Sequence, residues 1–493
     1  LKDSPAANLN LRVNAKGRLQ PDWAGQGKLI LEASQFAGYP LEGYAEGAFA
    51  PGRLSQASVD LAVLGNRLRL NGALGAAGDS LLFEIDAPHL ERFGAEYGGA
   101  FKGHGQLAGT LSNPFGSLEA QGQNLHAPGG WRLAGADFRA RLLPGSEGHF
   151  ELQADLQEFA RSGQVWARSL NLKGAGSRAH HSLLLAASLP GEHQLSARAE
   201  GGLREGLWSG SLQELTLRGE FDFTLEKPAS LILSAQRGSL GEARLLGRRE
   251  GSGRIELLHT EWSPERLIAK GRLSGLQVGF SLDEYQRTVF KGRSLQLGAE
   301  WDVTLAEQLR GLVHVFREDG DFILQGDSPV AFGLENLDLN LALSDGRLAL
   351  SALANGKRIG ALNAVATLAV KGRGSETRID MAAPMVGVLN ADIPSIGWLG
   401  PLANQNLRTE GSLRGQFNIT GTPDKPVSAG FIKGEKLVVA LAEQGLRLDE
   451  GQLALVFDAE RLKLETLHFR SPQRISPPDG RLRRPTGNGV LSG

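Results

Sequence analysis

Short runs in which polar and apolar residues alternate recur along the whole chain. One run covers residues 8–13, Asn-Leu-Asn-Leu-Arg-Val, and another covers residues 337–343, Leu-Asp-Leu-Asn-Leu-Ala-Leu. Alternation places every second side chain on the same face of a β-strand. A chain built from such runs is therefore expected to form a sheet with one apolar face and one polar face. The pattern predicts an all-β protein, made of one long, mostly antiparallel, curved sheet.

Turn signals separate the runs and favour hairpins over helical crossovers. Asp345-Gly346 lies between two alternating runs, and this dipeptide fits the two-residue loop of an antiparallel hairpin. Few helices are expected, and these are short segments over residues 88–97, 155–160 and 393–404. We expect one continuous β-structure over residues 1–493, with possible sub-units at 1–102, 103–206, 207–400 and 401–493.

The composition excludes several classes of function. Glycine contributes 66 of 493 residues and aromatic residues only 6%, which suits sheets with many turns better than a large enzyme core. The 53 Lys and Arg residues are balanced by 54 Asp and Glu residues, so no basic surface is expected to bind nucleic acid. The absence of cysteine excludes disulfides and thiolate metal sites.

Membrane and targeting signals are also missing from the sequence. No apolar run approaches the ~20 residues that a membrane-spanning helix needs, and the first residues do not form a signal peptide. The chain starts at Leu1 rather than Met, and we expect it to be an internal fragment of a longer protein. On that expectation, missing anchors say little about location.

No residue pattern indicates catalysis or metal binding. No serine is flanked by glycines two positions before and two after it, as a nucleophile elbow requires. His180 and His181 are adjacent, so in a strand they point to opposite faces and form a poor metal site. The acidic segment 318–321 lacks the further ligands of a calcium loop. We expect no enzymatic activity, no metal and no cofactor.

Several phrases, taken in order, are similar to those of a known family. They are Glu-Ile-Asp-Ala-Pro-His-Leu at 84–90, Gly-x-Gly-x-Leu-x-Gly-Thr-Leu-x-Asn-Pro at 103–114, Trp-Ser-Gly-Ser-Leu-Gln-Glu-Leu at 208–215, Gly-Ser-Leu-Arg-Gly at 411–415, and Gly-Leu-Arg-Leu-Asp-Glu-Gly-Gln-Leu at 445–453. Each phrase alone is weakly specific, and their order and spacing carry the likeness. Over nearly its whole length the chain resembles the middle portion of the TamB family, within the wider AsmA-like group.

This resemblance implies a fold, a location and partners. The family has an N-terminal inner-membrane helix, a long periplasmic β-groove of taco-like cross-section with an apolar interior, and a C-terminal end that contacts the outer-membrane barrel TamA. The expected role is phospholipid transport between the inner and outer membranes of a Gram-negative bacterium, together with translocation and assembly of outer-membrane and autotransporter proteins. We expect the membrane helix and the TamA contact to lie outside this chain.

The residues themselves are also compatible with a lipid groove. The apolar face of a curved sheet has to be covered by a second sheet, by helices or by a ligand. Leucine, valine and alanine dominate the alternating runs, and these side chains suit acyl chains. Burial contributes about 0.8 kcal/mol per methylene, so a sixteen-carbon chain needs about 12 kcal/mol from any path that replaces the bilayer. The candidate groove residues are Leu9, Leu11, Val13, Leu215, Leu217, Leu337, Leu339, Leu341 and Leu343.

Three alternatives stay open at this stage. The same leucines could pack against a second sheet of the protein, and the sequence does not say which face lies inside. An extracellular β-solenoid adhesin would share the glycine-rich, cysteine-free composition, although the runs show no regular rung length. A chaperone that adds a client strand to an exposed sheet edge would also fit.

Overall fold

The structure is a computed structural model. It describes residues 7–492 except for 19, 21, 146, 220–221, 283–287, 308, 326–328, 373–376, 401–405, 442–443, 460 and 471–489. Within the strands, only the backbone is described at residues 280–282, 288–293, 324–325 and 490–492. The chain divides into two compact units, unit 1 over Leu1–Ala235 and unit 2 over Gln236–Gly493.

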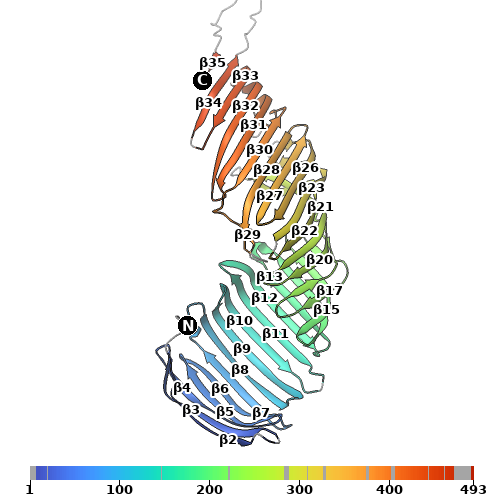
Figure 1. The fold of residues 1–493 in the computed structure, drawn as a ribbon. Helices are drawn as coiled ribbons and strands as arrows, with labels where there is room; N and C mark the ends of the chain where they lie inside the picture. Colours follow the sequence, from blue (N-terminus) through green and yellow to red (C-terminus); the bar gives the residue numbers. More distant parts are fainter. Residues whose placement is uncertain are drawn as a thin grey trace, which may run out of the picture. The chain divides into compact units, whose positions relative to one another are not determined.

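Unit 1 is a curved layer of antiparallel strands (Figure 1). From β3 to β14, every strand pairs with the strand that precedes it and the strand that follows it in the chain. The strands are β1 (Ala7–Asn8), β2 (Leu11–Arg18), β3 (Ala24–Phe36), β4 (Tyr39–Ala50), β5 (Arg53–Val63), β6 (Asn66–Leu74), β7 (Ser80–Ala87), β8 (Gly98–Thr110), β9 (Asn113–Ala127), β10 (Trp131–Leu142), β11 (Phe150–Arg161), β12 (Gln164–Gly176), β13 (His181–Ser188), β14 (Gln194–Arg204), β15 (Leu207–Arg218), β16 (Phe223–Leu225) and β17 (Ala229–Leu233).

Unit 2 is built in the same way. Its strands are β18 (Gly238–Leu240), β19 (Ala243–Gly247), β20 (Arg254–Trp262), β21 (Leu267–Leu282), β22 (Thr288–Leu305), β23 (Leu309–Gly320), β24 (Ile323–Gln325), β25 (Val330–Ala331), β26 (Leu334–Ser344), β27 (Arg347–Gly356), β28 (Gly360–Lys371), β29 (Arg378–Ile379), β30 (Val386–Ile393), β31 (Leu407–Thr422), β32 (Lys425–Leu441), β33 (Leu446–Phe457), β34 (Leu462–Arg470) and β35 (Val490–Ser492). The described pairings are antiparallel except that β24 lies parallel to β21. The prediction of an all-β, mostly antiparallel fold is confirmed.

The hairpin predicted at Asp345-Gly346 is present between β26 and β27. Ser344 pairs with Arg347 across the two-residue loop. Asp345 and Gly346 have φ angles of 48° and 74°, and positive φ at both central positions is typical of a type I′ turn. The right-handed twist of such a turn matches the twist of the flanking strands, so this dipeptide fixes the register of the pair.

The helix predictions had mixed outcomes. Residues 88–97 contain one short 3-10 helix, η1 (Leu90–Phe93), and a second, η2 (Pro190–Glu192), was not predicted. The helix predicted over residues 155–160 is wrong, because this segment lies inside β11 and pairs with β10 and β12. Alternate residues of β11 form part of the apolar face, so the two-residue period of this segment favours a strand over a helix. The segment predicted at 393–404 contains a turn in which the Leu399 N–H donates to the Ile396 carbonyl, and its last four residues lie outside the described residues.

Candidate functional site

A continuous row of apolar side chains crosses unit 1 from β2 to β15. Residues directly opposite each other in an antiparallel pair share a face, so the registers can be followed from strand to strand. The first row, here called the Leu11–Leu215 ladder, contains one residue from each strand. Its members are Leu11, Leu31, Gly43, Leu61, Leu68, Ile85, Gly103, Ala120, Phe138, Ala154, Leu172, Leu185, Ala197 and Leu215. It contains no polar side chain.

Two further rows run beside this ladder on the same face. The Val13–Leu212 ladder consists of Val13, Leu29, Ala45, Val59, Leu70, Phe83, Gly105, Leu118, Ala140, Leu152, Gly174, Leu183, Ala199 and Leu212. The Ala87–Leu217 ladder consists of Ala87, Phe101, Gly122, Ala136, Leu156, Leu170, Ala187, Leu195 and Leu217. Neighbouring rows are two residues apart along most strands, so together they form a broad apolar band.

The opposite face of unit 1 is polar. The row between the two long apolar ladders contains Asp60, Arg69, Glu84, His104, Glu119, Arg139, Gln153, Lys173, Leu184, Arg198 and Glu214. Charges of opposite sign often lie opposite each other, as where Arg69 Nη1 lies 3.1 Å from Glu84 Oε2. Exposed ion pairs of this kind stabilise a fold by only about 0–1 kcal/mol each. The charges favour contact of this face with water.

The apolar face is accessible to other molecules. Leu61, Ile85, Phe138, Leu172 and Leu215 are all half-buried rather than buried. The chain as a whole exposes 31062 Å². Two separate compact domains, each with half of the 52.6 kDa mass, would together expose about 21,000 Å². The large excess indicates that much of the sheet surface lacks a second layer of protein.

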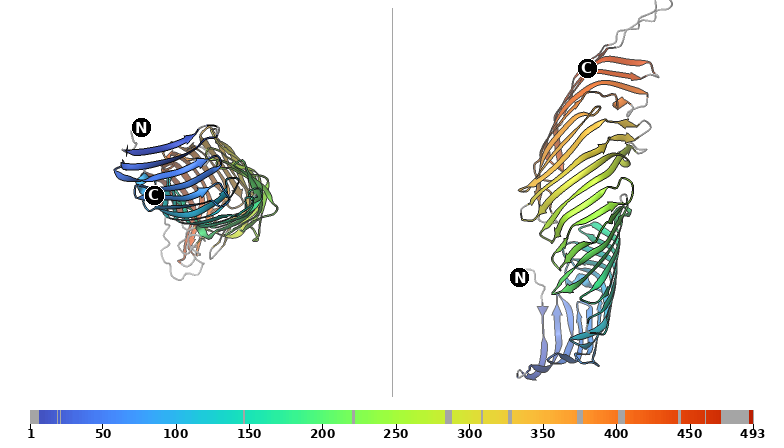
Figure 2. Two further views of the ribbon diagram at one scale, coloured as in Figure 1. Left: turned by 90° about the horizontal axis from the view of Figure 1, so that it is seen from below. Right: turned by 90° about the vertical axis from the view of Figure 1, so that its right-hand side faces the viewer.

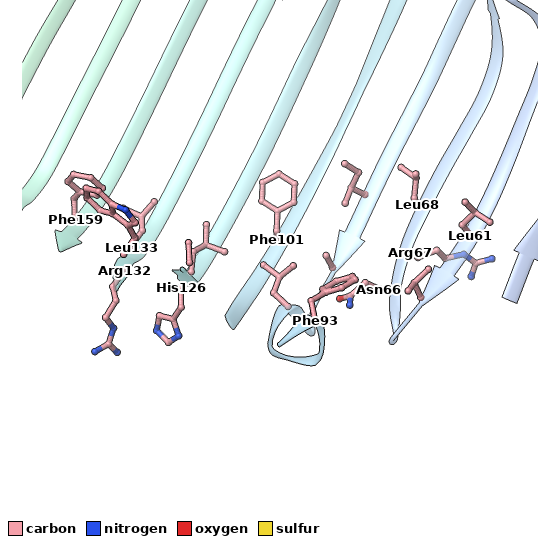
Figure 3. A pocket seen from close by; sticks show the side chains of 17 residues that line it. Leu61, Asn66, Arg67, Leu68, Phe93, Phe101, His126, Arg132, Leu133 and Phe159 are labelled. Atoms are coloured by element: carbon pink, nitrogen blue, oxygen red, sulfur yellow. The ribbon is translucent and has the colours of Figure 1, made fainter. Parts of the chain in front are cut away.

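An apolar pocket of about 850 Å³ lies at one end of the strands of unit 1 (Figure 3). Its wall includes Leu61, Leu68 and Ile85 of the first ladder and Ala87 and Phe101 of the third. Leu125 and Leu133, a cross-strand pair of β9 and β10, extend the wall. This volume lies in the upper part of the range of about 300–1,000 Å³ that is typical of small-molecule sites.

The helix η1 forms one border of this pocket. Leu90 and Phe93 line it, and Phe93 is 46% exposed. Asn66 holds the segment in place, because its Nδ2 donates to the His89 carbonyl at 3.0 Å and its Oδ1 accepts from the His89 N–H at 2.9 Å. Arg92 Nη1 donates to the Leu64 carbonyl at 3.0 Å. These polar contacts hold η1 in place, while its apolar side chains line the pocket.

Aromatic rings form the border on the other side. Trp131 and Phe159 line the pocket and stack with ring centroids 5.2 Å apart. Trp166, which is 45% exposed, meets Trp131 edge-on at 5.4 Å. The Arg161 guanidinium lies over the Trp131 ring, 5.0 Å from its centroid. The pocket is therefore closed by aromatic rings at its margin and stays open above the sheet.

Charged residues touch the pocket only at its edge. Arg67, His126 and Arg132 belong to its lining, and no aspartate or glutamate does. Arg67 is neutralised by Asp60, with Nε–Oδ1 and Nη2–Oδ2 distances of 2.7 and 2.5 Å. This hydrogen bonding from Arg67 lowers the pKa of Asp60 below its ordinary value. Arg132 and His126 are a cross-strand pair and point away from Phe101 and Leu133 (Figure 3).

Unit 2 has an apolar face of the same kind. Its main row runs from β19 to β34 and contains Leu245, Ile255, Leu273, Ala299, Val315, Leu339, Ala352, Ala364, Leu389, Phe417, Gly430, Phe457 and Leu462. A row through Leu341 contains Ala243, Leu257, Gly271, Trp301, Val313, Leu350, Ala366, Gly387 and Ile419 before it reaches Ser428. The opposite face contains Arg244, Glu256, Arg272, Glu300, His314 and Asn340.

Parts of the apolar face of unit 2 are filled by the chain itself. Phe322 and Phe332 lie 5.0 Å apart between ring centroids, and Phe332 lies 4.9 Å from Trp398. Phe332 and Ile396 are buried, with exposures of 5% and 6%. Phe332 lies between β25 and β26, and Ile396 follows β30. Ile396 packs in one cluster with Leu437 and Phe469.

The structure places the predicted groove residues as follows. Leu11 and Leu215 are members of one ladder, Val13 begins the second, and Leu217 ends the third. Leu337, Leu339, Leu341 and Leu343 alternate along β26 and are half-buried. Leu9 lies between β1 and β2 and is 55% exposed. Leu11, Val13, Leu215 and Leu217 thus share a face, whereas the role of all the predicted residues in lipid binding stays a prediction.

The pocket itself was missed by sequence reasoning. Leu90 and Phe93 belong to the irregular segment η1, and Trp131 begins a strand directly after a glycine turn. Aromatic residues close to turn signals, as at Trp131 and Trp166, would have been the available indication. The convergence of the lining residues depends on the register of seven strands, β5 to β11, which no local pattern specifies.

The two motifs rejected as metal sites have structural roles. His181 is buried, its Nδ1 lies 2.9 Å from the Ser177 carbonyl, and its Nε2 accepts from Trp208 Nε1 at 2.8 Å. In the acidic segment, Asp321 accepts hydrogen bonds from the backbone N–H groups of Gly333 and Leu334. No group of three or more histidine, aspartate or glutamate side chains is placed to hold a metal ion in the described ranges.

Part of the chain matches a known protein family. Residues 5–241 match the model of TamB, N-terminal domain, a stretch that nearly coincides with unit 1. Over this stretch the chain is TamB-like. TamB-type proteins belong to the bacterial envelope. Comparison of the TamB-like chain with curated proteins and with solved structures found no match. The expectation that it is a middle portion stays a prediction.

Among the helices that the structure describes, none combines the length and the apolar character needed to cross a bilayer.

Proposed function

We propose that the apolar face of this TamB-like protein holds the acyl chains of phospholipids and provides a hydrophobic path for them between the inner and outer membranes. The observation that carries the proposal is the Leu11–Leu215 ladder, which crosses β2 to β15 without a polar side chain. Burial of a sixteen-carbon chain contributes about 12 kcal/mol. A single unpaired charge in the path would cost several kcal/mol and would create a barrier.

The pocket in unit 1 supports the same proposal. It is apolar inside and open above the sheet, and these two properties suit acyl chains better than a small polar substrate. Polar groups converge on a small-molecule catalytic site, whereas Arg67, His126 and Arg132 touch this pocket only at its edge. We propose a binding and transport role and no enzymatic one.

The location and the partners form part of the proposal. A path between two membranes fits the periplasm, with an inner-membrane anchor and a contact to the barrel TamA outside this chain. A role in the assembly of outer-membrane and autotransporter proteins is compatible with the edge strand β2. Among the described residues β2 has one long hydrogen-bonded neighbour, β3, and Leu11 and Val13 are 51% and 58% exposed. A client strand could add to that edge.

Two neighbouring leucines of β13 provide a matched test. Leu185 belongs to the apolar ladder, between Leu172 and Ala197. Leu184 is 47% exposed on the polar face, between Lys173 and Arg198. Leu185→Glu places a charge in the proposed path, whereas Leu184→Glu places the same charge next to two cations.

The measurement is the amount of phospholipid that co-purifies with each variant, quantified by mass spectrometry. We expect Leu185→Glu to lower it by about tenfold or more, since 1.4 kcal/mol is tenfold and a charge in an apolar path costs more. Leu184→Glu should retain the wild-type amount. The same loss in both variants, or in neither, would argue against a lipid path on this face. Far-ultraviolet circular dichroism confirms that both variants are folded.

A further inference from the structure

A diacyl lipid in the pocket of unit 1 has to place its polar head outside the apolar wall. Burying an unpaired phosphate among side chains such as Phe101 and Leu133 would cost several kcal/mol. The strands that line the pocket end at η1 and at the turn between β9 and β10. The head group therefore leaves over this margin.

The same margin carries a cation without a partner. Arg132 is exposed, and within the described part of the chain its side chain makes no hydrogen bond and no ion pair. Its cross-strand neighbour is His126, and both side chains project beyond the ends of β9 and β10 (Figure 3). A guanidinium has five N–H donors arranged to bind two phosphate oxygens at once. No carboxylate lines the pocket to compete for it.

The other arginines of this margin are already engaged. Arg67 is held by both oxygens of Asp60. Arg92 donates to the Leu64 carbonyl and lies 4.8 Å from the centroid of the Tyr39 ring. Arg161 lies over Trp131. The charge that is free to meet a ligand at the pocket edge is that of Arg132.

We infer that Arg132, with His126 beside it, binds the phosphate of a phospholipid whose acyl chains occupy the pocket of unit 1. The inference rests on the proposed function and adds a selectivity to it: the pocket prefers lipids that carry an anionic phosphate. Arg132 is a binding residue that contacts the ligand directly. A free phosphate ion would have the same head-group chemistry but no acyl chains, so the test separates the two sources.

The experiment measures binding of two fluorescent lipids with identical acyl chains to the full chain. One is phosphatidylglycerol and the other is diacylglycerol, which lacks the phosphate. Charge-assisted hydrogen bonds have a strength that corresponds to about tenfold or more in affinity, so we expect at least that preference for phosphatidylglycerol. Arg132→Gln should reduce the preference to below about threefold, Arg132→Lys should retain part of it, and diacylglycerol binding should not change.

Arg141→Gln is the matched control. Arg141 lies in the same strand, also exposed and without an ion pair in the described part of the chain, about 30 Å along β10 from Arg132. Its variant should keep the full preference.

Each other outcome overturns the inference in a distinct way. Equal binding of both lipids by the wild type, or an unchanged preference in Arg132→Gln, refutes the phosphate site but leaves the groove intact. Displacement of phosphatidylglycerol by an equal concentration of inorganic phosphate would assign the site to a free ion. Failure of both lipids to bind would overturn the proposed function as well.

Discussion

Units 1 and 2 share an apolar face but differ in what covers it. In unit 1 the segment η1 lies at the margin, Phe93 stays 46% exposed, and the pocket of about 850 Å³ is open. In unit 2 the segments that contribute Phe332 and Ile396 fold onto the sheet, and both side chains are buried. A described pocket of unit 2 lies instead on its polar face, lined by residues such as Arg272 and Glu300.

This difference shows that two properties of such a sheet, which face is apolar and whether that face is covered, depend on different parts of the chain. Alternation along the strands decides which face is apolar, and it does so equally in both units. The segments between strands decide whether that face is open to a ligand or covered by the protein. Lipid binding is therefore expected to be strongest where these segments stay at the margin, as in unit 1.

The largest effect is expected from charges on the apolar face of unit 2. Leu339→Asp combined with Leu341→Asp places two carboxylates in adjacent rows, and each costs several kcal/mol in an apolar path. Photo-cross-linking of lipid beside β26 should fall by about tenfold or more. Asn340→Asp with Ala342→Asp alters the opposite face of the same strand and should leave the labelling unchanged. Unchanged labelling in the first double variant would show that lipid does not follow this face of unit 2.

The next prediction compares the two covering segments directly. Phe332→Ala removes a buried ring that contacts Phe322 and Trp398, and such a truncation costs about 3–5 kcal/mol. Phe93→Ala removes a half-exposed ring and should cost under about 1 kcal/mol. Hydrogen exchange should therefore show lost protection around β24 to β27 in the first variant and little change around β7 and β8 in the second. Equal losses would mean that η1 is as structural as the segments in unit 2.

A smaller and more uniform effect is expected where an aromatic ring covers a glycine. An added Cβ at Gly105 would lie 2.3 Å from the Ser117 carbonyl oxygen and 2.4 Å from the Phe83 ring. At Gly271 it would lie 2.5 Å from both the Glu256 carbonyl oxygen and the Trp301 ring. Gly105→Ala and Gly271→Ala should each destabilise their own unit by about 1–3 kcal/mol, measured as lost hydrogen-exchange protection. A change in only one variant would contradict the common design of the two faces.

The smallest effect concerns acid stability. Hydrogen bonds from Arg67 to Asp60, and from Asn171 and then Gln153 to Asp155, lower the pKa of both carboxyls in unit 1. In unit 2, Lys371 lowers the pKa of Asp380. A carboxyl whose folded-state pKa is lowered stabilises the fold above its unfolded pKa, about 4, and this contribution is lost as the pH falls through the folded value.

Hydrogen-exchange protection factors measured between pH 5 and pH 3 test this expectation. Protection around β5–β6 and β11–β12 should fall across this window. In Asp155→Asn, which has no carboxyl to titrate at this position, the fall around β11–β12 should be smaller. An identical acid profile for wild type and variant would show that Asp155 does not contribute.

Much of the fold could be predicted from single strands, because the two-residue period is a local property. It predicted the antiparallel sheet and the turn at Asp345-Gly346. It also outweighs the local helix-like spacing at residues 155–160, where neighbouring strands on both sides provide hydrogen bonds. The sequence could not say that Leu11 and Leu215 lie on one ladder, since that follows only from thirteen successive registers.

The site was predicted less completely than the fold. The predicted residues lie on alternating strands, whereas the pocket depends on η1 and on the aromatic rings near the turn between β9 and β10. The position of η1 follows from the hydrogen bonds between Asn66 and His89, which are 23 residues apart in the chain. Contacts of this range leave no periodic signal in a single sequence.

The most direct test of the central claim is a map of cross-links from a phospholipid with a photoreactive group at the end of its acyl chain. We expect labelled peptides to place the cross-links on the apolar ladders, at residues such as Leu68, Ile85 and Phe101. Leu82 and Leu184 are exposed leucines on the polar face, at 53% and 47%, and should stay unlabelled. Labelling of these two leucines at the level of the ladder residues would show that lipid contacts any exposed apolar side chain, and would contradict an acyl-chain path on one face.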